Sequence, residues 1–328
     1  AVIAGCRYYF GYPITTQSEL IEYMAKRLPQ VDGTFLQAES EVAAINMVYG
    51  GAGCGKRVMT SSSSPGMSLK QEGLSYMAGA DLPGLVVSVM RGGPGLGTIQ
   101  SSQADYFQTV KGGGHGDYKM ITLAPASVQE MADFTVLGFE LAFKYNIVSV
   151  VLADGIIGQM MEKVQLPPYQ KRLTNDEIRE KYPWATLGKP ANRKPNVITS
   201  LELDSALMEQ RNLNLQKKYK EIEKNEVRYE EIACEDAEYL LVAFGSSARI
   251  CQKTVELARE KGIKLGLFRP ITLFPFPTNE IYAYTNTVKA ILTVELNAGQ
   301  MVEDVRLAVN GTIPVEHYGL MGGIVPTA

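Results

Sequence analysis

The chain has 328 residues, of which 45% are hydrophobic and 20% are charged, a composition typical of a globular protein of about two domains. Its 32 basic and 35 acidic residues give a net charge of −3, which argues against a dedicated nucleic-acid-binding protein. The sequence contains no signal peptide and no uncharged apolar run of the roughly 18 residues that a membrane span needs, so we expect a cytoplasmic protein without membrane contact.

The cysteines and histidines are too few and too scattered to build a metal centre. No two cysteines form a C-x-x-C pair, and His115 and His317 are the only histidines. We therefore predict no metal site in this chain and expect reduced thiols. The four cysteines are Cys6, Cys54, Cys234 and Cys251.

The first 160 residues alternate between short apolar strands and helices. Strands are predicted at Phe35–Ala38, Arg57–Ser61, Leu85–Met90, Met120–Leu123 and Ile147–Leu152. Helices are predicted at Glu41–Gly50, Pro65–Ala78 and Ser127–Tyr145. Because the strands are almost continuously apolar, the pattern favours an α/β fold with a parallel sheet covered by helices on both faces.

The composition changes after this first domain. Residues 161–234 are polar and charged and predict a linker with one solvated helix at Asp204–Glu231. Residues 235–328 return to the α/β pattern and predict a second, smaller domain. Its strands are expected at YLLVAFG, KLGLFRP and VKAILTVE, with helices at Ser247–Lys261, Thr278–Tyr284 and Gln300–Asn310.

The run GGAGCGK at Gly50–Lys56 matches the first seven positions of a nucleotide-binding P-loop, but we reject that interpretation. Arg57 stands where a P-loop has the Ser or Thr that binds magnesium. The run also follows a helix and leads into a strand, which is the reverse of the P-loop order. A glycine-rich helix end explains it better.

Polar residues follow three successive strands of the predicted sheet. Glu39 and Glu41 follow the first strand, the hydroxyls of Thr60–Ser64 end the next, and Arg91 ends the third. Ligands of open parallel sheets bind in the crevice beyond the carboxyl ends of the strands. An arginine between a buried strand and a glycine-rich loop favours an anion clamp at this edge.

Seven motifs together resemble those of the α subunit of the 2-oxoacid:ferredoxin oxidoreductases, which are thiamine-diphosphate enzymes. The resemblance covers essentially the whole chain, and it implies residues ahead of Ala1 in the family. It also implies a thiamine-diphosphate-binding fold: a pyrimidine-binding-type domain followed by a domain similar to the C-terminal domain of transketolase. The motifs are YPITTQSE, QAESEVAAINMVYG, TSSSSPG, MRGGPGLG, GGGHGD, FRPITLFPFP and VELNAGQMVEDVR.

The resemblance implies a role for the carboxylate that opens the second predicted helix. In the family, the glutamate at the position of Glu41 hydrogen-bonds the aminopyrimidine ring of the cofactor and is catalytic, and Glu39 is its competitor within the same motif. Ser62 and Ser63 match the hydroxyl motif expected to contact the cofactor.

Further motif positions imply contacts with the substrate. Thr15 and Arg91 match the positions that hold the substrate carboxylate, and Thr16 replaces the usual proline, which predicts a less rigid turn. His115, between glycines, either reaches the substrate or caps a loop.

The chain lacks the GDG motif that binds magnesium and diphosphate in these enzymes; Ala153-Asp154-Gly155 is the nearest match. The resemblance therefore implies a β subunit that completes the thiamine-diphosphate site with Mg²⁺, γ and ferredoxin-like δ subunits, and [4Fe-4S] clusters on those partners. CoA would accept the acyl group, and ferredoxin would accept the electrons.

The resemblance implies 2-oxoisovalerate as the substrate, since the overall pattern is closest to the 2-oxoisovalerate type. Relatives that use 2-oxoglutarate tend to carry a basic residue after the position of Arg91, whereas Gly92–Gln103 carries no charge that would suit a second carboxylate. A 2-oxoglutarate enzyme is the alternative. Two further alternatives are a non-catalytic α/β binding or regulatory subunit and a thiamine enzyme of the transketolase or sulfopyruvate type that does not use ferredoxin.

Overall fold

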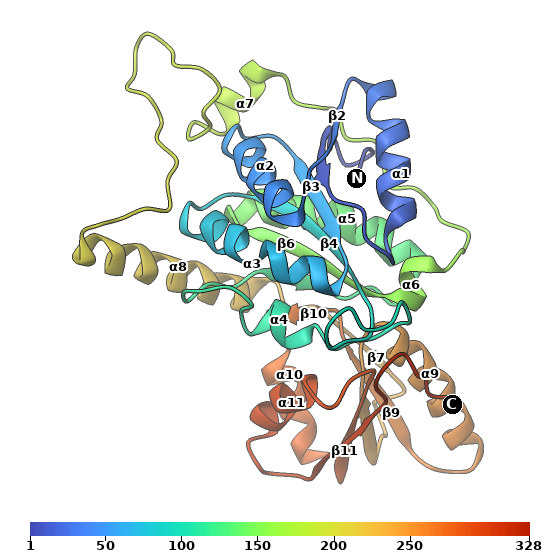
Figure 1. The fold of residues 1–328 in the computed structure, drawn as a ribbon. Helices are drawn as coiled ribbons and strands as arrows, with labels where there is room; N and C mark the ends of the chain where they lie inside the picture. The colour runs from blue at the N-terminus through green and yellow to red at the C-terminus, as the bar shows by residue number, and fades with distance from the viewer.

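Two β-sheets organise the chain, and a computed structural model describes residues 1–328 (Figure 1). In spatial order, the seven strands of the first sheet are β10 (Thr272–Phe274), β5 (Ile121–Leu123), β6 (Val148–Asp154), β4 (Gly84–Met90), β3 (Val58–Ser62), β1 (Tyr8–Gly11) and β2 (Thr34–Gln37). The second sheet has the order β12 (Val315–Gly319), β11 (Ala290–Glu295), β8 (Tyr239–Val242), β9 (Leu265–Pro270) and β7 (Tyr229–Ile232).

The first sheet is parallel except at one edge, where β10 runs antiparallel to β5. Every residue of β3, β4 and β6 is buried, which explains why these strands read as continuous apolar runs. The five strands predicted in this domain are confirmed. Strand β1 was not predicted, although its aromatic residues favour strands, because it has only four residues and a short local pattern.

Helices cover both faces of this sheet, as predicted (Figure 1). Ile45 of α2 and Met67 of α3 pack in a core on one face. Met24 of α1 and Phe139 of α5 pack in a second core on the other face. The helices of this part are α1 (Ser18–Arg27), α2 (Glu41–Gly53), α3 (Ser64–Gly79), α4 (Tyr106–Val110), α5 (Val128–Tyr145), α6 (Gly155–Gln159), α7 (Asn175–Lys181) and α8 (Ser205–Asn225), with a 3-10 turn at Pro29–Val31.

The predicted helix at Asp204–Glu231 is wrong at its end. Helix α8 stops at Asn225, and the buried Glu226 carboxylate accepts hydrogen bonds from Tyr145 at 2.7 Å and Arg228 at 2.9 Å. The chain then enters β7, which pairs antiparallel with β9. A strand of the second sheet therefore lies inside the segment predicted as linker.

The second sheet is parallel apart from β7, and its helices follow the predicted order. Strand β12 was not predicted. The helices are α9 (Gly245–Glu260), α10 (Thr278–Ala283) and α11 (Met301–Val309), with a 3-10 turn at Tyr284–Asn286.

Gln103 links the domain of the first sheet to the domain of the second sheet through buried hydrogen bonds. Its side-chain NH₂ donates to the Phe244 carbonyl at 2.8 Å, and its side-chain oxygen accepts from the Ser247 hydroxyl at 2.9 Å and from the Leu296 N–H at 3.1 Å. Gln103 is fully buried. The end of the uncharged segment after β4 is thus fixed to the second domain.

Arg269 makes a second link between the domains. This buried arginine of β9 binds both carboxylate oxygens of Glu130 in α5, at 2.6 and 2.8 Å, and its Nε donates to Glu230 at 2.7 Å. Bidentate geometry makes this a strong ion pair. The arginine of the motif FRPITLFPFP therefore has a structural role here.

None of the helices combines the length and the apolar character that crossing a membrane requires.

We expect Gln103→Ala to destabilise the folded chain by roughly 2–4 kcal/mol, because it leaves the buried Phe244 carbonyl and Leu296 N–H without partners. Urea or thermal unfolding of both variants measures this. The matched control is Gln100→Ala in the same segment, whose exposed side chain should change stability by less than about 0.5 kcal/mol. Equal effects of the two substitutions would contradict the role of Gln103.

Candidate functional site

The carboxyl ends of four neighbouring strands, β4, β3, β1 and β2, meet at one edge of the first sheet. Thr15 follows β1, Glu41 follows β2, Ser62 ends β3 and Arg91 follows β4. The fold therefore brings these predicted residues to the same edge, where parallel sheets bind ligands.

Glu41 is buried at this edge, whereas its competitor Glu39 is exposed. Glu41 is the first residue of α2, and Ser40 caps that helix by accepting from the Ala43 N–H at 3.2 Å. The carboxylate packs against Gly66 in the first turn of α3. A Cβ atom at Gly66 would lie 2.5 Å from Oε1 of Glu41 and would also clash with the Ser62 hydroxyl. The site thus requires a glycine there.

Three hydroxyls at the end of β3 are buried and have no hydrogen-bond partner or only a weak one, and the Ser62 hydroxyl lies close to Glu41. The Oγ atoms of Thr60 and Ser63 have no partner, and Ser62 donates to the Ser63 carbonyl only at 3.5 Å. Ser63 precedes α3 yet makes no side-chain cap. Buried hydroxyls normally have partners, so these groups are suited to a polar ligand that supplies them.

Arg91 is buried and lies against the turn that follows β1. Its Nη1 donates to the Thr15 carbonyl at 2.6 Å, whereas its Nε has no partner. The Arg91 backbone N–H donates to the Ser64 hydroxyl at 3.1 Å, which joins it to the start of α3. The Thr15 side chain is exposed beside this cation.

The turn between β1 and α1 is held by buried polar contacts. The Thr16 hydroxyl donates to the Val89 carbonyl at 3.2 Å, and the Ser61 hydroxyl donates to Gln17 at 2.5 Å. Tyr9 shares a hydrogen bond with Ser61 at 2.6 Å. The threonine at the usual proline position thus anchors the turn to β4 through its hydroxyl, which offsets the flexibility that the loss of proline predicts.

Asp105 is a site residue that the sequence analysis missed. It accepts a hydrogen bond from the Ser64 hydroxyl at 2.5 Å, close to Arg91. Burial raises the pKa of Asp105 to about 6, against the lowering effects of the Ser64 hydrogen bond and the Arg91 charge. Its sequence position after the uncharged segment did not indicate a place in the site, because only the tertiary fold brings Asp105 to the start of α3.

His115 lies apart from these residues. Its side chain is exposed, and its carbonyl accepts from the Ser75 hydroxyl at 2.6 Å, about three turns along α3 from Ser64. Its ring meets the Tyr76 ring edge-on, with centroids 6.0 Å apart. The structure thus does not bring His115 to Thr15 and Arg91.

Asp154, in the nearest match to the GDG motif, links the domains instead. It is fully buried, caps α6 by accepting from the Ile157 N–H, and accepts from the Ser246 N–H at the start of α9 at 2.8 Å. No group of three or more His, Cys, Asp or Glu side chains in the chain is arranged to hold a metal ion.

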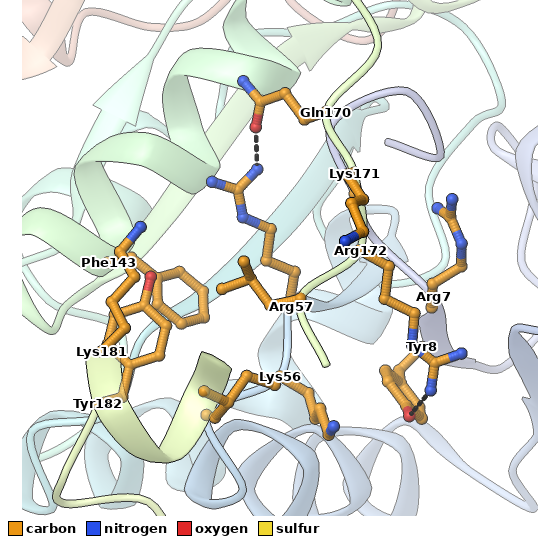
Figure 2. Close-up of a pocket in the computed structure, with 14 residues that line it drawn as sticks. Arg7, Tyr8, Lys56, Arg57, Phe143, Gln170, Lys171, Arg172, Lys181 and Tyr182 are labelled. Atoms are coloured by element: carbon orange, nitrogen blue, oxygen red, sulfur yellow. Dashed lines mark hydrogen bonds between the residues drawn. The ribbon is translucent and has the colours of Figure 1, made fainter. Parts of the chain in front are cut away.

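A basic cavity of about 180 Å³ lies at the opposite edge of the sheet, beside the starts of β1 and β3 (Figure 2). Two of its cations are bonded to neutral groups: Lys56 Nζ donates to Asn175 at 2.5 Å, and Arg172 donates to the Tyr8 hydroxyl at 3.0 Å. They hold the segment around α7 against the sheet, and the sequence analysis did not predict this cavity. The basic lining residues are Arg7, Lys56, Arg57, Lys171, Arg172 and Lys181.

Comparison with known proteins identifies the family. Residues 1–231 match the pyruvate flavodoxin/ferredoxin oxidoreductase, thiamine diphosphate-binding family, and residues 237–328 match core domain II of pyruvate:ferredoxin oxidoreductase. The chain belongs to this family. The predicted thiamine-diphosphate-binding α/β fold and the family resemblance are therefore confirmed.

Individual members of the family differ in their similarity to the chain. It is 52% identical to the ketoisovalerate oxidoreductase subunit VorB of Methanothermobacter marburgensis, covering 98% of this chain and 90% of the relative. It is 37% identical to the 2-oxoglutarate synthase subunit KorA of Archaeoglobus fulgidus, covering 93% and 87%. The solved 2-oxoglutarate:ferredoxin oxidoreductase of Magnetococcus marinus superimposes with a TM-score of 0.84 at 27% identity; the match covers 99% of this chain and 61% of that one.

The raised pKa of Asp105 predicts a pH-dependent stability effect. The folded state holds the proton up to about pH 6, against an ordinary value of 3.8, so stability falls as pH rises through this window. Asp105→Asn removes the charge and should raise the free energy of unfolding at pH 7.5 by up to about 3 kcal/mol. The gain should vanish near pH 4.

Chemical denaturation of wild type and variant at pH 4, 5, 6 and 7.5 checks this expectation. Asp117→Asn, at an exposed position, is the control and should show no comparable pH-dependent gain. A loss of stability at pH 7.5 in Asp105→Asn would mean that the attraction of the Asp105 carboxylate to the Arg91 charge outweighs desolvation.

Proposed function

We propose that the chain is the α subunit of a 2-oxoacid:ferredoxin oxidoreductase that converts 2-oxoisovalerate, CoA and oxidised ferredoxin into the acyl-CoA, CO₂ and reduced ferredoxin. The observation that carries the proposal is the buried Glu41 carboxylate at the carboxyl edge of a sheet in a thiamine-diphosphate-binding family. The 52% identity to a ketoisovalerate oxidoreductase subunit supports the substrate.

Glu41 is proposed to hydrogen-bond the aminopyrimidine ring nitrogen and to hold the proton shared there. Thiamine diphosphate, when bound, supplies the carbon nucleophile and the electron sink for decarboxylation. The unpartnered Ser63 hydroxyl and the weakly bonded Ser62 hydroxyl are suited to hydrogen bonds with the same group. Burial of Glu41 excludes water from the carboxylate and strengthens its hydrogen bonds.

Arg91 and Thr15 are proposed to bind the substrate carboxylate. Arg91 is buried and its Nε has no partner, so the guanidinium retains a donor for an anion. The exposed Thr15 hydroxyl follows the same turn. His115 stays a prediction as a further substrate contact, which a movement of its exposed glycine-rich loop would have to bring about.

Other subunits are proposed to complete the enzyme. A β subunit would bring Mg²⁺ and the diphosphate site, γ and ferredoxin-like δ subunits would assemble with it, and [4Fe-4S] clusters on the partners would pass electrons to ferredoxin. The word "subunit" in the names of the relatives supports a multi-subunit enzyme. Four free cysteines are in keeping with a reducing cytoplasm.

Glu41→Gln in the assembled complex should lower kcat by about 100- to 10,000-fold, because it removes a positioned acid–base group. Steady-state reduction of a low-potential dye with 2-oxoisovalerate and CoA measures the rate. Glu39→Gln is the matched control and should keep nearly the wild-type rate, since Glu39 is exposed. An inactive Glu39→Gln beside an active Glu41→Gln would show that the other carboxylate is catalytic.

The complex should prefer 2-oxoisovalerate over 2-oxoglutarate in kcat/KM by about tenfold or more. The segment after Arg91 has no charge, and it exposes Leu96 and Ile99. A distal carboxylate would lose water there without gaining a partner, whereas each buried methyl gains about 0.8 kcal/mol. Measuring kcat/KM for both substrates on the co-expressed complex tests this, and preference for 2-oxoglutarate would show that a partner subunit supplies a cation.

A further inference from the structure

Lys70 is a buried cation without a hydrogen-bond partner in α3, the helix that packs against Glu41. Its side chain is 0% exposed in α3, and its Nζ atom makes no hydrogen bond. Moving an ammonium group out of water is costly unless another group compensates it. A buried lysine in this condition therefore calls for an explanation beyond packing.

Lys70 lies on the face of α3 that packs against the Glu41 carboxylate. Lys70 comes four residues after Gly66, whose Cα packs against the Glu41 carboxylate. Residues four apart lie one above the other on a helix. Burial lowers the pKa of Lys70 to about 8, and the charge of Glu41 counteracts part of that effect. The two groups thus interact through the protein interior without a direct hydrogen bond.

The strands and the helix packed against α3 offer no competing charge. Strands β3 and β4 contain no charged residue, and Glu41 is the only charged residue of α2. The loop after α4 also packs on α3; its Lys111, His115 and Asp117 are exposed, and its Tyr118 hydroxyl donates to Gln71. Asp154 at the end of β6 is bonded to Ser246 across the domain joint, and Asp105 is bonded to Ser64 at the start of α3. Glu41 is the charged group that acts on Lys70.

We propose that Lys70 is a positioning residue for Glu41: its buried ammonium attracts the Glu41 carboxylate and holds it where it can share a proton with the cofactor. Through low-dielectric protein, a positive charge attracts a carboxylate without touching it. The catalytic part of this role rests on the proposed function; the coupling of Lys70 to Glu41 does not.

A role in packing and a role in charge predict opposite effects of the same substitution. Lys70→Met keeps an unbranched side chain, one atom shorter, and removes the buried ammonium. If Lys70 only filled space, the variant would keep its activity and its pH profile. If the charge of Lys70 positions Glu41, the variant keeps or gains stability and loses function at low pH.

The first measurement is thermal unfolding of the full chain in a double-mutant cycle of Lys70→Met and Glu41→Gln at pH 7. Lys70→Met alone should keep or raise the melting temperature. Glu41→Gln alone should lower it by roughly 2–4 °C, because the ammonium loses its counter-charge. Added to Lys70→Met, Glu41→Gln should have no such effect. Additive shifts would overturn the coupling, as would an unchanged melting temperature in Glu41→Gln alone.

The second measurement uses the assembled complex. In Lys70→Met, the acid limb of kcat/KM for the 2-oxoacid should move to higher pH by about one unit, and Lys70→Arg should restore it. The affinity for thiamine diphosphate, measured by calorimetry from pH 5.5 to 8, should show the same displacement. An unmoved acid limb and an unchanged affinity profile would overturn the proposal.

Lys56→Met is the matched control, since Lys56 is a mostly buried lysine at the opposite edge of the sheet and has a partner in Asn175. It should lower the melting temperature and leave the acid limb in place. An equal shift of the acid limb in Lys56→Met would overturn the assignment to Lys70. A wild-type complex that oxidises neither 2-oxoacid would refute the proposed function alone, because the unfolding cycle still decides whether Lys70 and Glu41 are coupled.

Discussion

The candidate site depends on the close approach of two helices at the carboxyl edge of the first sheet. Glu41 opens α2, Gly66 lies in the first turn of α3, and a single Cβ atom at Gly66 would displace the Glu41 carboxylate. This contact buries the carboxylate beside the weakly bonded Ser62 hydroxyl, on the face of α3 that also carries Lys70. A charged group in such surroundings has few hydrogen-bond partners within the chain. The polar interior is therefore organised for groups that come from outside it.

The second domain holds the far end of the segment that follows Arg91. Gln103 and Asp154 bind backbone groups of the second domain, and Arg269 binds Glu130 across the same joint. Arg91 and Gln103 thus bracket a segment with one end in the first sheet and the other at the domain joint. The tip of this segment carries no charge and exposes Leu96 and Ile99 beside Arg91.

The sequence also contained strong signals that concern structure and not chemistry. Arg269 in FRPITLFPFP forms an interdomain ion pair. Glu295 in VELNAGQMVEDVR accepts from the Met301 N–H at 2.8 Å and the Val302 N–H at 3.0 Å, and so caps α11. The glycine-rich run ending at Lys56 closes a helix, as predicted, because α2 ends at Gly53. A motif shared within a family can thus mark a joint or a cap as readily as a reacting group.

The sequence by itself determined the central strands, the helices on both faces and the edge at which Glu41, Ser62 and Arg91 meet, because buried strands and amphipathic helices follow local apolar patterns. The short strand β1, the antiparallel strands β7 and β10, and the true end of α8 required the tertiary structure, since distant pairing stabilises them more than local sequence does. The same holds for Asp105 and Lys70. Their roles arise from burial and from neighbours far away in the sequence. Neither the residue type nor the spacing of residues indicates that a side chain is buried away from water.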